Sequence, residues 1–280
     1  MRTVFVGVIA LTVALAAAGC GGTAASDQKA EAPTIVAGFH PLAWVAEQVA
    51  GPSAHVVNLT PAGAEPHDLE LSPSDVRKVS DADLVIYVGG GFQPALEDAV
   101  AQRDGPSLDV LRPGESDPHI WLDPVRFSKV AHEVGQALGR PAAARKLEQM
   151  LAGVDTLYRR ALRRCSGTTF VTTHAAFGHL AKRYGLAQLS LAGRTPEAEP
   201  GPKEIERLVA AVKASGAPVV FAEPLISTDI AATVAREADV DVSFLDPLEG
   251  LSSARLDAGD DYVSVMRDNL EVLTKALACR

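Results

Sequence analysis

The sequence predicts an α/β protein of two lobes, each with a parallel sheet flanked by helices, joined by a long rigid helix. Three observations lead to this prediction. Short apolar runs alternate with helical stretches in both halves of the chain, as parallel strands with crossover helices require. Between these regions, residues 126–164 are helical in pattern apart from Gly139-Arg140-Pro141. The chain has 280 residues, 47% of them hydrophobic, which is enough for two modest domains with cores of their own.

The first lobe is expected at residues 34–124. The segment Ser72-Pro73-Ser74-Asp75 has the pattern of a helix start, with a Ser cap, Pro in the first turn and an acid three residues after the cap. Gly51 is expected to end an earlier helix at 41–50. We expect strands at 34–38, 55–59, 84–88 and 119–122, and helices at 41–50, from 73 onward and at 94–102.

A helical region, 125–164, is expected to connect the lobes. Its second helix, 142–164, carries apolar residues at helical spacing and is long enough to cross the molecule. The second lobe is expected at 165–280. There we expect strands at 168–172, 186–190, 218–222 and 240–245, and helices at 175–184, 202–215, 228–238 and from about 260.

The N-terminus has the features of a secretory signal. Arg2 precedes an apolar run, Val4–Ala18, which is shorter than the roughly 20 residues of a transmembrane helix. Ala17-Ala18-Gly19-Cys20 resembles a bacterial lipobox, whose cysteine is lipid-modified and becomes the first mature residue. We expect a signal peptide at 1–19, a lipid on Cys20 that anchors the protein to the membrane outside the cytoplasm, and a flexible tether at 20–33. Simple secretion is the alternative.

The charge of the chain bears on which partners it binds, and its cysteines bear on whether it can form a disulfide outside the cytoplasm. The formal net charge of −9 argues against a nucleic-acid partner, since proteins that bind nucleic acid usually carry basic patches. Cys165 and Cys279 remain after the expected lipidation of Cys20. Outside the cytoplasm they can persist as a disulfide, with two unpaired thiols as the alternative.

Polar residues beside prolines follow several expected strands, where parallel α/β sheets bind ligands. His67 and His119 follow Glu65-Pro66 and Asp117-Pro118, and His174 closes another strand. Asp246, before Pro247, is a carboxylate at the same edge of the second sheet. Three imidazoles and one carboxylate oxygen suit tetrahedral Zn²⁺. Three unrelated loop histidines would give the same spacing.

Six segments in order, covering essentially the whole mature chain, resemble one family, the zinc- and manganese-binding solute-binding lipoproteins of ABC transporters (cluster A-I). They are GAEPHDLELSPSD (63–75), DADLVIYVGGGF (81–92), DPHIWLDP (117–124), THAAFGHLAKRYGL (173–186), FAEP (221–224) and FLDPL (244–248). The resemblance implies that His67, His119 and His174 are metal ligands and that Asp246 is the fourth. Some zinc members use water in the fourth position, and Glu65 is a further candidate for it.

The resemblance also bears on which metal is bound. Manganese members tend to have a carboxylate at the third position, so His174 favours Zn²⁺. Many zinc members carry a histidine-rich insertion before the second ligand, whereas this chain has only Leu111–Ser116 there. Mn²⁺ therefore stays open as the alternative. We expect Glu223 and Asp68 to orient a ligating imidazole and His179 to be structural.

The function implied by the resemblance is the capture of Zn²⁺ between the lobes and its delivery to an ABC permease driven by its ATPase. We expect a monomer that is not an enzyme, because the sequence has no HExxH motif, no GxSxG elbow and no cysteine nucleophile with a paired base. The alternatives are a manganese- or iron-binding homologue and an adhesin-like lipoprotein, and less plausibly a zinc hydrolase.

Overall fold

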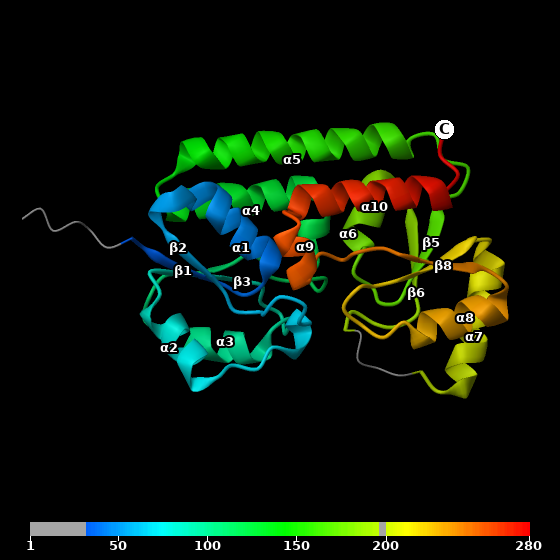
Figure 1. Ribbon diagram of the computed structural model, residues 1–280, viewed down its shortest axis with the longest axis horizontal. Coiled ribbons are helices and arrows are strands. Elements are labelled where there is room, and N and C mark those ends of the chain that lie inside the picture. Colours follow the sequence, from blue (N-terminus) through cyan, green and yellow to red (C-terminus); the bar gives the residue numbers. More distant parts are fainter. Residues whose placement is uncertain (1–31, 196–199) are drawn as a thin grey trace, which may run out of the picture. The chain divides into compact units, whose positions relative to one another are not determined.

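The computed structural model describes residues 32–195 and 200–280, and Ala32–Arg280 form one compact unit. The expected signal peptide at 1–19, the lipidation site Cys20 and all but the last two residues of the tether at 20–33 lie outside the described residues. The described part contains two four-stranded parallel sheets flanked by helices (Figure 1). The predicted fold class is therefore confirmed.

The first sheet has the strand order β2-β1-β3-β4. Its strands are β1 (Thr34–Ala37), β2 (His55–Asn58), β3 (Leu84–Tyr87) and β4 (Ser107–Asp109). Side chains alternate between the two faces, so Ile35 and Ala37 belong to the main core and Val36 to a smaller one. The smaller core includes Val79 of α2 (Pro73–Asp81) and Leu96 of α3 (Pro94–Ala101), which cover the lower face in Figure 1.

The second sheet repeats this plan with the order β6-β5-β7-β8. Its strands are β5 (Thr169–Thr172), β6 (Ala187–Ser190), β7 (Val219–Ala222) and β8 (Asp241–Phe244), and its helices are α6 (Gly178–Tyr184), α7 (Pro202–Ser215) and α8 (Asp229–Ala238). Val171 and Val220 pack with α7 and α8 in a core of their own. Phe170 and Phe221 face the other way and join the main core.

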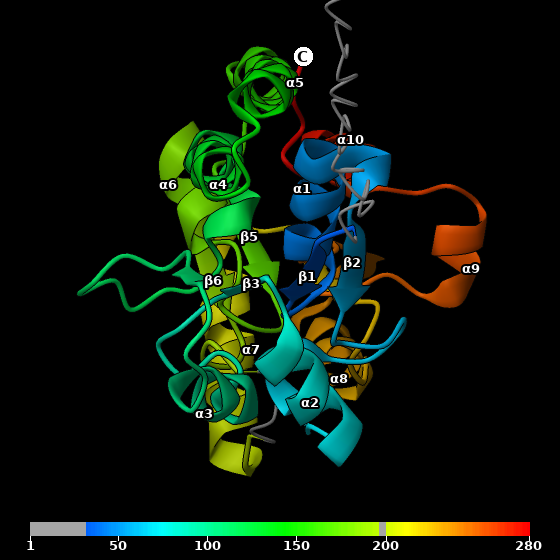
Figure 2. The same ribbon diagram turned by 90° about the vertical axis from the view of Figure 1, so that its left-hand side faces the viewer.

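Four longer helices lie on one side of the two sheets (Figures 1 and 2). They are α1 (His40–Ala50), α4 (Pro124–Ala137), α5 (Pro141–Leu162) and α10 (Tyr262–Ala276), with the short α9 (Ser253–Asp257) before α10. Figure 1 shows α5 running along both lobes and α10 running from between them along the second lobe. Tyr158 of α5 donates a hydrogen bond to the carbonyl of Met266 in α10 (2.6 Å). Tyr262 stacks on Trp44 of α1, so α10 begins against the first lobe although we expected it within the second.

The predicted disulfide between Cys165 and Cys279 is present. It joins the segment after α5 to the segment after α10. The two cysteines also form an isolated antiparallel bridge. Among the described residues, no helix has both the length and the apolar character needed to cross a membrane.

The expected strand at 119–122 is wrong, because Ile120–Leu122 form a 3-10 turn. Ile120 N–H donates to the carbonyl of Pro118 and Leu122 N–H to that of His119, so these groups are not available to a sheet. The fourth strand is β4, whose three residues include one apolar side chain, Leu108. Two further 3-10 turns lie at Gly51–Ser53 and Pro66–Asp68, and α6 begins at Gly178, later than the expected 175.

Candidate metal centre

His67 lies in the turn Pro66–Asp68 that follows β2. The carboxylate of Glu65 accepts a hydrogen bond from its N–H (3.4 Å), and the amide of buried Gln93 donates to the Pro66 carbonyl (3.3 Å). The imidazole packs edge-on against Phe92, with ring centroids 4.4 Å apart. Its side chain is 3% exposed. The turn therefore fixes both the backbone and the ring of His67.

His119 is fully buried and is held by Asp117, two residues earlier. One oxygen of Asp117, Oδ1, lies 3.2 Å from the backbone N of His119 and 2.8 Å from its Nδ1. With Nδ1–H directed to this carboxylate, Nε2 is left with its lone pair toward the interior. A carboxylate that orients a histidine in this way is the usual arrangement around a metal ligand.

His174, also fully buried, lies two residues after β5 and is held by Glu223, the residue after β7. Glu223 Oε2 is 2.5 Å from Nδ1 of His174, and Glu223 Oε1 accepts a hydrogen bond from its backbone N–H (3.0 Å). Because β5 and β7 are neighbours, the sheet places Glu223 beside the histidine. As in the first lobe, a carboxylate holds Nδ1 and turns Nε2 inward.

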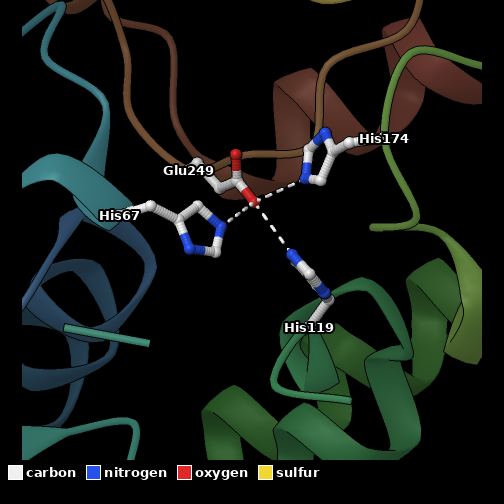
Figure 3. A group of neighbouring side chains, drawn as sticks. All are labelled: His67, His119, His174 and Glu249. Carbon is white, nitrogen blue, oxygen red and sulfur yellow. Dashed lines mark hydrogen bonds and ion pairs between the residues drawn. The ribbon is translucent and has the colours of Figure 1, made fainter. Parts of the chain in front are cut away.

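The three Nε2 atoms converge on Oε1 of Glu249, in the loop after β8 (Figure 3). Their distances to this oxygen are 3.5 Å for His67, 3.1 Å for His119 and 3.2 Å for His174. All four candidate ligand atoms lie within 4.8 Å of one another. Ligands bound to zinc at about 2.0–2.1 Å in a tetrahedron are about 3.3 Å apart. The distances to Glu249 are therefore close to those of a tetrahedral site.

Several atoms of this group lack hydrogen bonds despite being buried. They include both ring nitrogens of His67, Nε2 of His119 and Oε2 of Glu249. Leaving a buried polar atom unpaired is costly, and native structures contain few of them. A cation at the centre would accept lone pairs from the nitrogens and compensate the charge of the carboxylate. The donor set thus fits a metal ion.

The charges of the group are strongly coupled. Burial alone would raise the pKa of Glu249, but the three neighbouring histidines lower it well below the usual range. Burial likewise opposes protonation of His174, yet Glu223 and Glu249 raise its pKa to about 10. The pKa of His119 is also raised, against burial, by Asp117 and Glu249. Without a metal, a proton on His174 partly balances the charge of the buried carboxylate.

Glu65, the other candidate for the fourth position, is not part of this group. Burial, and next the charge of Glu249, raise its pKa to about 8. Its carboxylate instead accepts the N–H of His67.

Asp246, the expected fourth ligand, is not brought to the histidines. Its Oδ1 accepts a hydrogen bond from Leu248 N–H (2.8 Å), and its Oδ2 lies 3.3 Å from Nη1 of Arg255. Burial raises its pKa to about 6. Leu248 has a φ of 60°, and this left-handed turn precedes Glu249, whose carboxylate reaches the histidines. Asp246 thus shapes the loop, and the carboxylate that lies beside the three histidines is that of Glu249, which the sequence analysis missed.

Among the other expected residues, Glu223 does orient a histidine, whereas Asp68 makes no side-chain hydrogen bond to the three histidines within the described parts of the chain. His179 is a structural neighbour, with Nε2 3.0 Å from the Asp117 carbonyl and 3.6 Å from its Oδ2. Asp117 was not singled out by the sequence analysis. The motif Asp117-Pro118-His119 could have identified it, because it places the carboxylate two residues before the histidine.

Comparison with known proteins gives a consistent result. The family model described as zinc-uptake complex component A periplasmic (ZnuA) matches residues 35–276. The zinc-binding protein AdcA of Streptococcus pyogenes serotype M1 is 33% identical over 282 residues, covering 85% of this chain and 55% of the relative. The chain thus spans about half the length of the curated relatives that it matches first.

Two solved structures share the fold over nearly their whole length. The laminin binding protein Lmb of Streptococcus agalactiae, described as bifunctional with adhesin and metal transporting activity, superposes with a TM-score of 0.80 at 29% identity, covering 88% of this chain and 99% of that one. The Zn(II)-bound ZnuA-like domain of Streptococcus pneumoniae AdcA gives a TM-score of 0.74 at 33% identity, covering 88% and 98%.

Proposed function

Because the chain belongs to the ZnuA family of zinc-uptake complex components, we propose that it captures Zn²⁺ outside the cytoplasmic membrane for an ABC importer. One observation carries the proposal. Nε2 atoms from both lobes, on His67, His119 and His174, surround one oxygen of buried Glu249. We assign these four side chains as the ligands of the transported ion. Since they are buried, an ion reaches them only when the surrounding loops move.

Zinc fits this donor set better than manganese does. Three imidazole nitrogens and one carboxylate oxygen are ligands that zinc prefers in four-coordinate sites, whereas Mn²⁺ favours oxygen-rich, octahedral sites. Asp117 and Glu223 hold two of the rings by Nδ1, so these rings are already oriented before the ion arrives. The protein therefore binds Zn²⁺ in preference to Mn²⁺.

The same geometry favours a carrier over a hydrolase. Catalytic zinc usually has three protein ligands and a water molecule in an open position. Here Glu249 is a fourth protein ligand and closes the shell. Residues of both lobes capture the Zn²⁺ ion. The ion is released when the loaded protein docks on its permease, and a cytoplasmic ATPase drives this permease. Cys20 anchors the protein to the membrane through its lipid. The buried group supports metal capture, and an adhesive role is not part of the proposal.

Competition titration against a zinc chelator tests the proposal, with a matched pair of histidine variants. The wild-type protein should bind one Zn²⁺ tightly, and His119→Ala should weaken binding by more than about a hundredfold because a ligand is lost. His179→Ala, which removes an imidazole that contacts Asp117 from outside the group, should change the affinity far less. Equal effects of the two substitutions, or an unchanged affinity in His119→Ala, would refute the assignment.

A further inference from the structure

A hollow of about 740 Å³ beside the C-terminal end of α5 is lined by six arginines. They are Arg159, Arg160, Arg163, Arg164, Arg183 and Arg280, and the other lining residues are Leu162 and Tyr184. Among the residues that the structure describes, no lysine or acidic residue lines it. So dense a positive cluster is unexpected on a chain whose formal net charge is −9. We call this feature the arginine hollow.

Three separate segments build the arginine hollow. Four of the arginines belong to the end of α5 and the residues just after it, Arg183 belongs to α6, and Arg280 follows α10. The disulfide between Cys165 and Cys279 brings the last segment to the first, and Arg280 N–H donates a hydrogen bond to the Arg164 carbonyl (3.1 Å). Figure 1 shows the C-terminus beside the end of α5. The fold thus gathers these charges from distant parts of the sequence.

Ion pairs neutralise only part of this charge. Arg183 pairs with Asp155 and Asp123, and Arg159 pairs with Asp155. Arg160, Arg163, Arg164 and Arg280 are exposed and have no ion pair among the described residues. The negative end of the α5 dipole stabilises cations in the last turn of that helix. It does not account for Arg280, which a different segment carries into the same hollow.

The chemistry of arginine indicates the ligand. The planar guanidinium group donates two parallel hydrogen bonds to phosphate oxygens, and it is preferred over lysine where phosphate is recognised in this way. Four unpaired guanidinium groups around one hollow exceed the charge of a single phosphate. We propose that the arginine hollow binds a ligand with two or more phosphate groups, either a soluble oligophosphate or adjacent headgroups of anionic phospholipids. This site is separate from the metal centre.

Two probes distinguish a soluble phosphate ligand from phospholipid headgroups. Binding of inorganic triphosphate is measured by calorimetry, and binding to vesicles of phosphatidylglycerol with phosphatidylcholine is measured by co-sedimentation. Pure phosphatidylcholine vesicles are the uncharged reference. The hollow variant is R160Q/R163Q/R164Q. The matched control is R77Q/R145Q/R267Q, which removes the same charge from three exposed arginines on α2, α5 and α10 that line no part of the hollow. R280Q is a second hollow variant that leaves α5 intact.

The hollow variant should bind at least one phosphate probe about tenfold or more weakly, since it loses three charged hydrogen-bond donors. The control variant should bind nearly as the wild type does, and R280Q should lie between them. Triphosphate binding identifies a soluble ligand, and vesicle binding without triphosphate binding identifies the membrane surface. If the wild type binds neither probe, or the hollow and control variants lose binding equally, the proposal is overturned. Zinc affinity should be unchanged throughout.

Discussion

Nε2 of His119 lies 3.1 Å from Oε1 of Glu249, although His119 follows the first sheet and Glu249 follows the second. Both side chains are essentially excluded from solvent. A hydrogen bond from Trp121 Nε1 to the Pro247 carbonyl (2.7 Å) fixes the same two segments to each other. The two lobes therefore meet at the position that we assign to the metal.

We predict that Glu249→Gln weakens zinc binding by more than about tenfold, because the amide removes the only ionised carboxylate of the ligand set. Glu65→Gln is the matched control, since Glu65 is also partly buried nearby but already neutral at pH 7. Competition titration should show a large loss for Glu249→Gln and little change for Glu65→Gln. The reverse order would make Glu65 the fourth ligand.

Asp246 is predicted to act on the loop and not on the ion. Asp246→Ala leaves the buried N–H of Leu248 without its acceptor and frees the left-handed turn before Glu249, so zinc affinity should fall by about tenfold. Asp246→Asn keeps an oxygen that can accept this hydrogen bond and should recover most of the affinity. If Asn proves as damaging as Ala in the same titration, Asp246 is a direct ligand.

Zinc affinity should fall as the pH decreases. The pKa of His174 is raised to about 10, so His174 holds a proton at pH 7 that zinc must displace, and the pKa of His119 is raised as well. Each displaced proton makes binding up to about tenfold weaker per pH unit. Calorimetry in buffers of different ionisation enthalpy should detect at least one proton released per zinc ion at pH 7. An affinity that is constant between about pH 6 and pH 8 would contradict this.

His40 should make the fold acid-sensitive independently of the metal. Burial lowers its pKa from 6.5 to about 4, against the opposing charge of Asp261, and its Nε2 has no hydrogen-bond partner. Below pH 6.5, His40 therefore takes up a proton in the unfolded chain but stays neutral in the folded chain. As a result, the free energy of unfolding falls as the pH decreases from 6.5 toward 4. Between pH 7 and pH 5 this loss is about 2 kcal/mol.

Urea unfolding with a chelator present measures this effect. His40→Phe should lose about 2 kcal/mol less than the wild type does between pH 7 and pH 5, because phenylalanine does not titrate. An identical pH dependence in the two proteins would show that His40 is protonated equally in the folded and unfolded states.

Hydrophobic runs and helix signals were sufficient to predict most of the fold. The capping box of Ser72 and Asp75 is present at the start of α2, and the buried runs in β1, β3, β5 and β7 lie at the centre of their sheets. The edge strand β4 could not be predicted, because its sequence Ser-Leu-Asp lacks an apolar run. The apolar run Ile120–Leu122 was mistaken for a strand because a buried 3-10 turn and a short buried strand have the same composition.

The metal centre was predictable to the extent that its residues follow strands. His67 and His119 could be singled out because each follows an acidic residue and a proline, and His174 because it lies two residues after β5. The choice between Asp246 and Glu249 could not be made, since both lie in one short loop. It depends on the left-handed turn at Leu248, which no hydrophobic pattern encodes.

X-ray absorption at the zinc edge, on protein loaded with one equivalent of zinc, tests the central claim most directly. We predict a four-coordinate shell of three imidazole nitrogens and one carboxylate oxygen at about 2.0–2.1 Å, reduced to two imidazoles in His119→Ala. A shell of water and carboxylate oxygens, or the same number of imidazoles in wild type and variant, would contradict the assignment of these residues as the zinc ligands.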